Sequence, residues 1–373
     1  MSADLDRYAC DARFPGVQLV RFIRREIERA RLDLKGLRVL TEASVSYRRV
    51  TPALAALAGA DEVYAVGRDS VAASRKEAEE QTGYFADLAR VGARVKLLPT
   101  RLQAPLDAVD VVTDLPGVRP VDESIVRNVA ATAAVALMRG AAHWRPADVD
   151  VATCRRRGVA VAAVDEEAVG LFRYPPLAAL AALLDLGVQV AGSTVVVAGN
   201  GPVLPYVVQA LSRLGARVFV AAPETAGRVW LYGGEKAGDA LGDEAVAGRL
   251  AEADALVLCP AGADARMVGP GAATDAADLA KAAPHLAVAG LGAEADLRAL
   301  DAAGLRCRTA GGPDGASDLL PQAVVARHAA GLKVAEVMTR ARRRGSSPPA
   351  AEQLAAAEAH AELLPKDLSA VRR

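Results

Sequence analysis

Residues 192–204 of the chain read GSTVVVAGNGPVL, and this stretch decides the fold. The β-branched run at 194–197 is typical of a buried parallel strand, and the glycines after it are typical of a tight turn. Apolar residues then recur at helical spacing over 206–214, and a second apolar run at 218–221 predicts another strand. This order of strand, glycine turn, helix and strand predicts the first unit of a dinucleotide-binding domain.

The glycine turn is the predicted binding loop for a nucleotide cofactor. Gly199 allows the tight turn, and Gly201 has no Cβ, so a pyrophosphate can approach the amides at the helix N-terminus. The usual third glycine is replaced by Leu204, and Ala222 stands where an acidic ribose ligand is expected. The cofactor-binding candidates lie in the loop and at the ends of two later strands: Gly199, Asn200, Gly201, Pro202, Val203, Ala222, Glu224, Arg228, Cys259 and Pro260.

The sequence leaves NAD and NADP open, with a lean toward relaxed or NADP preference. Glu224 would favour NAD by binding the ribose hydroxyls, whereas Arg228 would favour NADP by meeting a 2′-phosphate. The alternative interpretation is a nucleotide-like domain that has lost its ligand.

Composition bounds the domain count and the class of partner. A chain of 373 residues is too long for one compact core, so two domains are expected. Lysine plus arginine equals aspartate plus glutamate at 45 each, which gives no reason to expect nucleic acid or a membrane as partner. The four cysteines form no C-x-x-C pair, and the four histidines are dispersed, so we expect reduced thiols and no metal site. We therefore expect a cytoplasmic protein and a homo-oligomer such as a dimer.

Strand and helix patterns alternate along both halves of the chain, which predicts an α/β fold with two doubly wound, Rossmann-like parallel sheets. We expect a substrate-facing domain at 1–170 and 322–373, and a dinucleotide-binding domain at 171–321. A long helix over 320–343 would return to the first domain, followed by a linker at 345–349 and a helix at 352–363. Residues 223–239 lack clear periodicity and are a candidate loop over the cofactor.

Ligands of open parallel sheets bind beyond the carboxyl ends of the strands, which selects loops 42–49, 114–120 and 139–145 in the first half. The long helix adds two further polar side chains. The catalytic candidates are the proton-transferring groups Glu42, Tyr47, His143, His328 and Lys333. The substrate-binding candidates are the polar groups Ser46, Arg48, Arg119 and Arg145. The alternative is that these are solvated loops, helix caps and structural side chains.

Arg119 lies in a turn that two prolines make rigid, and its guanidinium can grip a carboxylate through two hydrogen bonds. We therefore expect it to bind substrate without contributing to stability. The competing interpretation is a surface ion pair between Arg119 and Asp122.

The layout over 148–303 resembles the D-isomer-specific 2-hydroxyacid dehydrogenase family. Four stretches carry the resemblance: 154–161, 175–184, 195–201 and 253–260. S-adenosylhomocysteine hydrolases and alanine dehydrogenases share the same two-domain plan. The resemblance implies this architecture with an interdomain cleft, and a nicotinamide cofactor, but the dehydrogenase catalytic set does not carry over. Leu291 stands where the family has arginine, residues 311–314 read GGPD where it has glutamate, and His328 lacks the family's proline–histidine context.

These observations favour an NAD(P)-dependent oxidoreductase that moves a hydride to or from a small polar, carboxylate-bearing substrate in the cleft. One alternative is a lyase or hydrolase that uses tightly bound NAD for transient oxidation. The other is a non-catalytic ligand-binding protein on a degenerate dehydrogenase scaffold.

Overall fold

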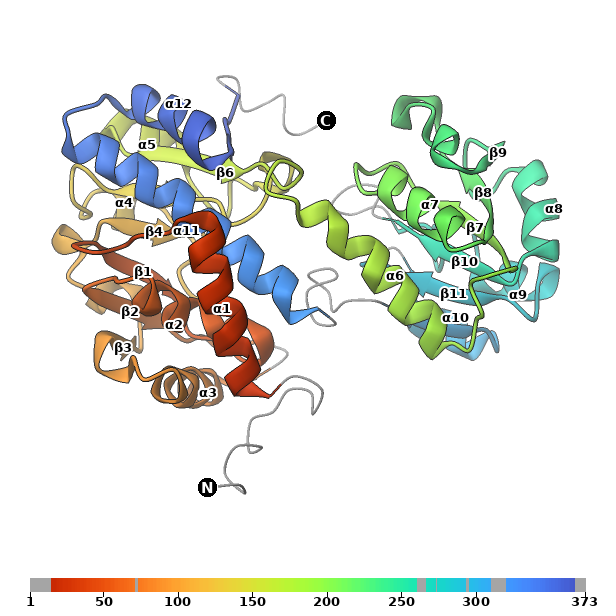
Figure 1. Ribbon diagram of the computed structural model, residues 1–373, viewed down its shortest axis with the longest axis horizontal. Helices are drawn as coiled ribbons and strands as arrows, with labels where there is room; N and C mark the ends of the chain where they lie inside the picture. Colours follow the sequence, from red (N-terminus) through yellow and green to blue (C-terminus); the bar gives the residue numbers. More distant parts are fainter. Residues whose placement is uncertain are drawn as a thin grey trace. The chain divides into compact units, whose positions relative to one another are not determined.

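The computed structural model describes residues 15–70, 73–259, 266–272, 274–292, 295–309 and 320–365 (Figure 1). The chain divides into two compact units. Unit 1 comprises Met1–Leu171 and Pro321–Arg373, and unit 2 comprises Phe172–Leu320. Each unit is built on a mainly parallel sheet flanked by helices, so the predicted fold class is confirmed.

Unit 2 contains the glycine turn, at the end of its first strand. Its strands are β7 (Thr194–Ala198), β8 (Arg217–Ala221), β9 (Glu235–Gly238), β10 (Ala255–Leu258), β11 (Ala287–Gly290) and β12 (Arg306–Thr309). Its helices are α6 (Tyr174–Asp185), α7 (Leu204–Arg213), η7 (Glu224–Ala226), η8 (Val229–Tyr232), α8 (Glu244–Glu252), α9 (Ala276–Ala282) and α10 (Leu297–Ala302). The strand order is β12-β11-β10-β7-β8-β9, all parallel, which is the order of dinucleotide-binding sheets.

Unit 1 repeats this order and adds one antiparallel strand. Its strands are β1 (Arg38–Glu42), β2 (Glu62–Val66), β3 (Val95–Leu98), β4 (Val111–Thr113), β5 (Ala134–Ala136), β6 (Ala160–Val164) and β13 (Ala361–Glu362), in the order β13-β6-β5-β4-β1-β2-β3. Its α-helices are α1 (Gly16–Ala30), α2 (Val50–Leu57), α3 (Arg75–Leu88), α4 (Glu123–Val126), α5 (Val151–Arg157), α11 (Pro321–Arg343) and α12 (Pro348–Ala359). Short 3-10 turns are η1 (Ser46–Arg49), η2 (Gly92–Arg94), η3 (Arg101–Gln103), η4 (Leu106–Ala108) and η5 (Ala141–His143), and η6 (Leu171–Arg173) spans the boundary between the units.

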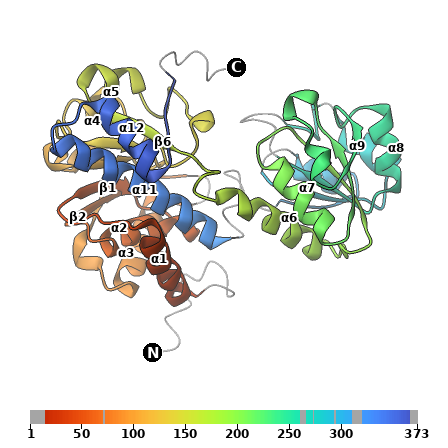
Figure 2. The ribbon, with the colours of Figure 1, turned by 45° about the horizontal axis from the view of Figure 1, so that its top comes forward.

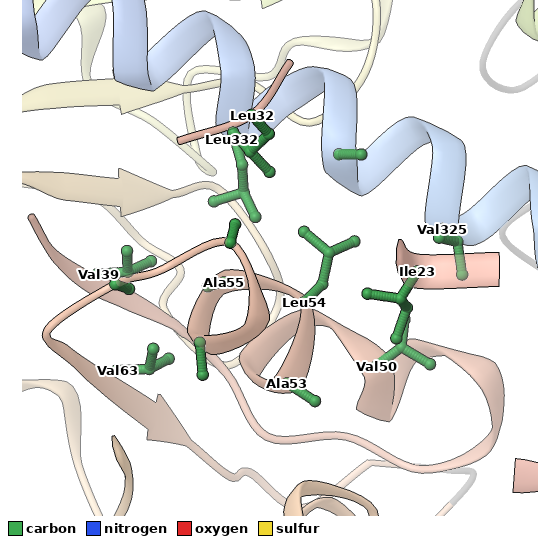
Figure 3. Packing of buried hydrophobic residues seen from close by; sticks show 14 of the residues in the cluster. Ile23, Leu32, Val39, Val50, Ala53, Leu54, Ala55, Val63, Val325 and Leu332 are labelled. Atoms are coloured by element: carbon green, nitrogen blue, oxygen red, sulfur yellow. The ribbon is translucent and has the colours of Figure 1, made fainter. Parts of the chain in front are cut away.

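Helix α11 organises one face of the unit 1 sheet. Figure 2 shows α11 beside α12, and the two helices share a core cluster with β5 and β6. Other residues of α11, Val325 and Leu332, pack with residues of α1 and α2, such as Ile23 and Leu54, all fully buried (Figure 3). Gly331 lets the helix approach the sheet, because a Cβ there would lie 2.5 Å from the sulfur of Met138.

Three details differ from the sequence expectation. Residues 235–238 form the edge strand β9 within the segment expected to be a loop. The expected linker at 345–349 is shorter, because α12 begins at Pro348 with Ser347 as its cap, and prolines fit a first helical turn. The helix predicted over 352–363 ends at Ala359, and the short strand β13 follows it.

No described helix is both long enough and apolar enough to cross a membrane.

Removing the Leu332 side chain should destabilise unit 1 strongly. Leu332→Ala would leave a cavity where α11 meets the sheet, and such changes typically lower the free energy of unfolding by about 2–5 kcal/mol. Leu102→Ala is the matched control, because Leu102 is 57% exposed and should cost under about 0.5 kcal/mol. Urea unfolding would measure both, and equal losses would contradict the assigned core.

Candidate functional site

The turn after β7 has a backbone that only glycine tolerates well. Gly199 has φ +148°, and a Cβ there would lie 2.6 Å from the carbonyl oxygen of Cys259, at the end of the neighbouring strand β10. Because β7 and β10 flank the point where the strand order reverses, this turn lies at the usual ligand position of such a sheet.

The residues after Gly199 suit a nucleotide pyrophosphate. The amide of Leu204 bonds to the carbonyl of Gly201 at 3.1 Å and closes the turn before α7. Within the described ranges, the amides of Asn200, Gly201 and Val203 form no hydrogen bond, and all three residues reach solvent. Amides at a helix N-terminus favour negative charge, so the loop fits a phosphate group.

The other cofactor-binding candidates have distinct environments. Leu204, in place of the third glycine, is a fully buried core residue, and Ala222 is also fully buried. Glu224 and Arg228 are exposed on the segment of η7 and η8, which packs on α7 and does not form a free loop. Pro202 is exposed in the turn, and Pro260 lies outside the described residues.

In unit 1 the equivalent edge lies beyond β1 and β4. Glu42 ends β1 and is buried, and the turn after β4 packs onto it at Gly117. A Cβ at Gly117 would collide with the carbonyl oxygen of Val66 and lie 2.9 Å from the Cβ of Glu42. Tyr47 is buried in η1, while Ser46 and Arg48 are half-buried beside it. These candidates therefore lie at the carboxyl edge of the unit 1 sheet, and their roles stay predictions.

Arg119 is bound by carboxylates of its own unit. Its guanidinium lies 3.2 Å from a carboxylate oxygen of Asp114 and 3.0 Å from one of Asp148, and its Nε donates to the Asp114 carbonyl. Asp122 instead caps α4 and pairs with Arg101 at 2.9 Å. The expected Arg119–Asp122 alternative is therefore wrong, and substrate binding by Arg119 stays a prediction.

His143 lies in the loop after β5, among charged side chains. Burial lowers the pKa of His143. The positive charges of Arg139, Arg327 and Arg145 lower this pKa further, whereas the negative charge of Glu166 raises it. Glu166 follows the neighbouring strand β6 and pairs with Arg327 at 3.3 Å between Oε1 and Nε. The His143 side chain reaches solvent, so it is accessible to a ligand.

His328 occupies a different environment on α11. It is 5% exposed, and its Nδ1 lies 2.5 Å from the hydroxyl of Thr51 in the first turn of α2. Burial, together with the charges of Arg327, Arg48 and Arg139, lowers the pKa of His328 to about 3. Burial and these charges therefore favour the neutral form of the ring, which argues against a role in storing a proton.

Lys333 contributes to structure and not to the proposed site. Its ammonium donates to the carbonyl of Arg31 at 2.7 Å and pairs with the buried Glu336 at 3.0 Å. Glu336 also binds Arg340 and accepts from the amide of Asp33, which fixes the turn after α1 to α11. The prediction of a catalytic Lys333 has no support from this geometry.

Sequence reasoning did not select Arg139, Glu166, Arg327 or Thr51 as site residues. Glu166 could have been found from its position, because it closely follows the end of a parallel strand. Arg327 lies inside a helical pattern, where an arginine is usually solvent-facing, so no local signal marked it.

Within the described ranges, no three histidine, cysteine, aspartate or glutamate side chains gather in a way that could hold a metal ion.

Comparisons with known proteins establish a likeness of fold. No family model and no curated protein matches the chain. One subunit of dipicolinate synthase from Bacillus halodurans aligns with TM-score 0.51 and 14% identity over 80% of this chain and 96% of that one. A dipicolinate synthase polypeptide from Bacillus subtilis aligns with TM-score 0.50 and 13% identity over 84% and 98%. D-lactate dehydrogenase with NAD+ from Lactobacillus jensenii aligns with TM-score 0.48 and 14% identity over 88% and 100%. The chain thus shares its two-domain fold with the two dipicolinate synthase chains.

Replacing Gly199 should destabilise unit 2. Gly199→Ala would force a Cβ against the Cys259 carbonyl and strain a positive φ, at a cost of about 1–3 kcal/mol. Gly192→Ala is the control, because Gly192 also has positive φ, +84°, but a Cβ there meets nothing within 4 Å. Thermal unfolding should show the larger loss for Gly199→Ala, and an equal loss would contradict the close approach to β10.

Arg119→Lys should lower stability. Lysine keeps the charge but cannot reach both carboxylates and the carbonyl, and Asp114 would stay buried with a poorer partner. The expected loss is about 1–3 kcal/mol in urea unfolding. Arg127→Lys, in an exposed pair with Glu123, should change stability by under about 0.5 kcal/mol. A stable Arg119→Lys variant would restore the substrate-binding interpretation of Arg119.

Proposed function

We propose that the chain is an NAD(P)-dependent oxidoreductase acting on a small, carboxylate-bearing substrate. The nucleotide part of the proposal is supported by the strand order of unit 2 and by the glycine turn at its switch point. The observation that carries the substrate class is the gathering of arginines at the carboxyl edge of unit 1.

The residues of unit 2 fit a dinucleotide. The amides of Asn200, Gly201 and Val203 would hold the pyrophosphate, and the buried Ala222 leaves no carboxylate at the usual ribose position. Exposed Glu224 and Arg228 are the nearby groups that would decide between NAD and NADP. When bound, the nicotinamide supplies or accepts the hydride.

The arginines of unit 1 fit a carboxylate. Arg48, Arg139 and Arg327 all act electrostatically on His328, and Arg139 and Arg327 also act on His143. The two histidines and these arginines therefore belong to one group of side chains. Guanidinium groups bind carboxylates through paired hydrogen bonds, which selects substrates with at least one carboxylate.

Oxidation of a substrate hydroxyl releases a proton as well as a hydride. We assign the proton to His143, which reaches solvent and has Glu166 nearby to stabilise its charged form. His328 favours its neutral form, so we do not assign the proton to it. Glu42 and Tyr47 are buried, so we propose that they shape the edge instead of exchanging protons.

Nucleotide binding tests the first half of the proposal. Calorimetry with NAD and NADP should show binding to the wild-type chain and at least about tenfold weaker binding to Gly201→Val, because a branched side chain would fill the approach to the amides. Gly248→Val, on the exposed side of α8, is the control and should bind normally. Absence of binding to the wild type would favour a non-catalytic protein, and cofactor that survives dialysis would favour transient oxidation.

Substrate turnover tests the second half. A panel of 2-hydroxy acids, 2-keto acids and cyclic dicarboxylates would be assayed by nicotinamide absorbance. Arg139→Gln should raise KM about tenfold or more for any carboxylate that reacts, whereas Arg127→Gln, outside the group, should not. Turnover confined to substrates without a carboxylate would contradict the arginine assignment.

A further inference from the structure

The turn that carries His143 is capped from a distant part of the chain. Turn η5 begins after Gly140, which has no side chain to accept a hydrogen bond from the first amides of the turn. The carboxylate of Glu362 takes that place, because its Oε2 accepts from the amide of Ala141 at 2.6 Å. The two partners are 221 residues apart in sequence, so this bond joins the C-terminal strand β13 to the loop after β5.

Gly140 makes room for that carboxylate. A Cβ at position 140 would lie 3.3 Å from Oε2 of Glu362, which is tighter than an ordinary van der Waals contact, and 3.8 Å from the Cγ of Glu166. The side chains of Glu362 and Glu166 therefore both approach the backbone at this one residue. Helices α4, α5 and α10, by contrast, are each capped by the aspartate at their own N-cap position. A side chain at position 140 would crowd the carboxylate that caps η5 from β13.

Strand β13 also fixes the loop that carries Glu166. It pairs antiparallel with β6, the strand that Glu166 closely follows. The carbonyl of His360, next to β13, accepts from the amide of Asp165 at 3.0 Å, and Asp165 immediately precedes Glu166. After β13, the guanidinium of Arg155 donates to the carbonyl of Pro365 at 2.8 Å. The strand is therefore held on both sides, and it is a fixed support for both loops.

One short strand thus supports both members of the proposed proton-transfer pair. We propose that Glu362 is a positioning residue, which holds His143 at a fixed place relative to Glu166 through the amide of Ala141. This rests on the proposed function, in which His143 takes the proton and Glu166 stabilises its charged form. Glu362 acts through the backbone two residues before His143 and has no assigned contact with substrate.

A loop histidine needs such a support. Loops move more than the strands they connect, whereas a catalytic group must be held within about 0.5 Å of its productive geometry. The surroundings of His143 act only at its present place: burial and three arginines oppose its protonated form, and Glu166 favours it. Release of the turn would weaken these effects together. Because their sum lowers the pKa of His143, release would raise that pKa toward its ordinary value.

Two variants of Glu362 separate its reach from its charge. Glu362→Asp keeps the charge but is one methylene shorter, so it should lose the bond to the Ala141 amide. Glu362→Gln keeps the reach and an acceptor oxygen but loses the charge. Proton NMR titration of the full chain, without cofactor or substrate, should show a raised pKa of His143 in Glu362→Asp. In Glu362→Gln this pKa should not rise, because loss of nearby negative charge favours the neutral ring.

A carboxylate elsewhere on the same sheet provides the matched control. Glu352 on α12 accepts from the amide of Val161, near the beginning of β6, at 3.0 Å. Glu352→Ala should leave the titration of His143 as it is in the wild type. An unchanged titration in Glu362→Asp, a rise of the same size in Glu362→Gln, or a rise of the same size in the control would overturn the inference.

Hydrogen exchange gives a second measurement that begins with the wild type. The Ala141 amide should be protected although it lies in a loop, and it should exchange at least about tenfold faster in Glu362→Asp. Unprotected exchange of this amide in the wild type would overturn the inference, even where Glu362→Asp failed to fold.

The two proposals fail in different ways. A chain that binds no nucleotide, but whose His143 responds to Glu362→Asp, would lose the redox function and keep the positioning contact. A chain that binds nucleotide, but whose His143 does not respond, would keep the cofactor and lose the role of Glu362.

Discussion

The packing of α11 across the unit 1 sheet is the constraint on which the rest of that unit depends. The helix spans residues 321–343, most of its side chains are buried, and Gly331 brings it into contact with Met138 after β5. Because its N-terminal half lies near the first turn of α2, the same packing that fills the core delivers Arg327 and His328 to the carboxyl edge. Core and site are thus set by one helix, and a change in the helix register would alter both.

Charge at this edge is arranged in two ways that serve different ends. Arg119 is paired with Asp114 and Asp148, which fixes the turn after β4. Around His328, by contrast, three arginines act on one neutral ring. The buried ring is therefore held neutral, while Arg327 keeps a carboxylate partner of its own, Glu166, at 3.3 Å.

The sequence predicted the elements that burial dictates and missed those that depend on pairing alone. Strand β7 and its glycine turn were evident, because a strand covered on both faces is a continuous β-branched run. Strands β9 and β13 were not, because an edge strand reading EKAG and a two-residue strand have no periodicity to detect. Loops after parallel strands could be placed at the carboxyl edge from the sequence, but the ion-pair partners of their side chains are distant in sequence: Asp148 for Arg119 and Glu336 for Lys333.

The two histidines show why residue type alone does not assign chemistry. His143 lies on a loop that reaches solvent, where Glu166 opposes the loss of its charged form. His328 is buried, with its Nδ1 2.5 Å from the Thr51 hydroxyl, and among the residues that the structure describes no carboxylate acts to keep a second proton on the ring. Proton exchange requires a group whose two charge states are close in free energy, whereas recognition requires one fixed state. The loop histidine fits the first requirement better, which is why the proposed proton transfer is assigned to His143 and not to His328.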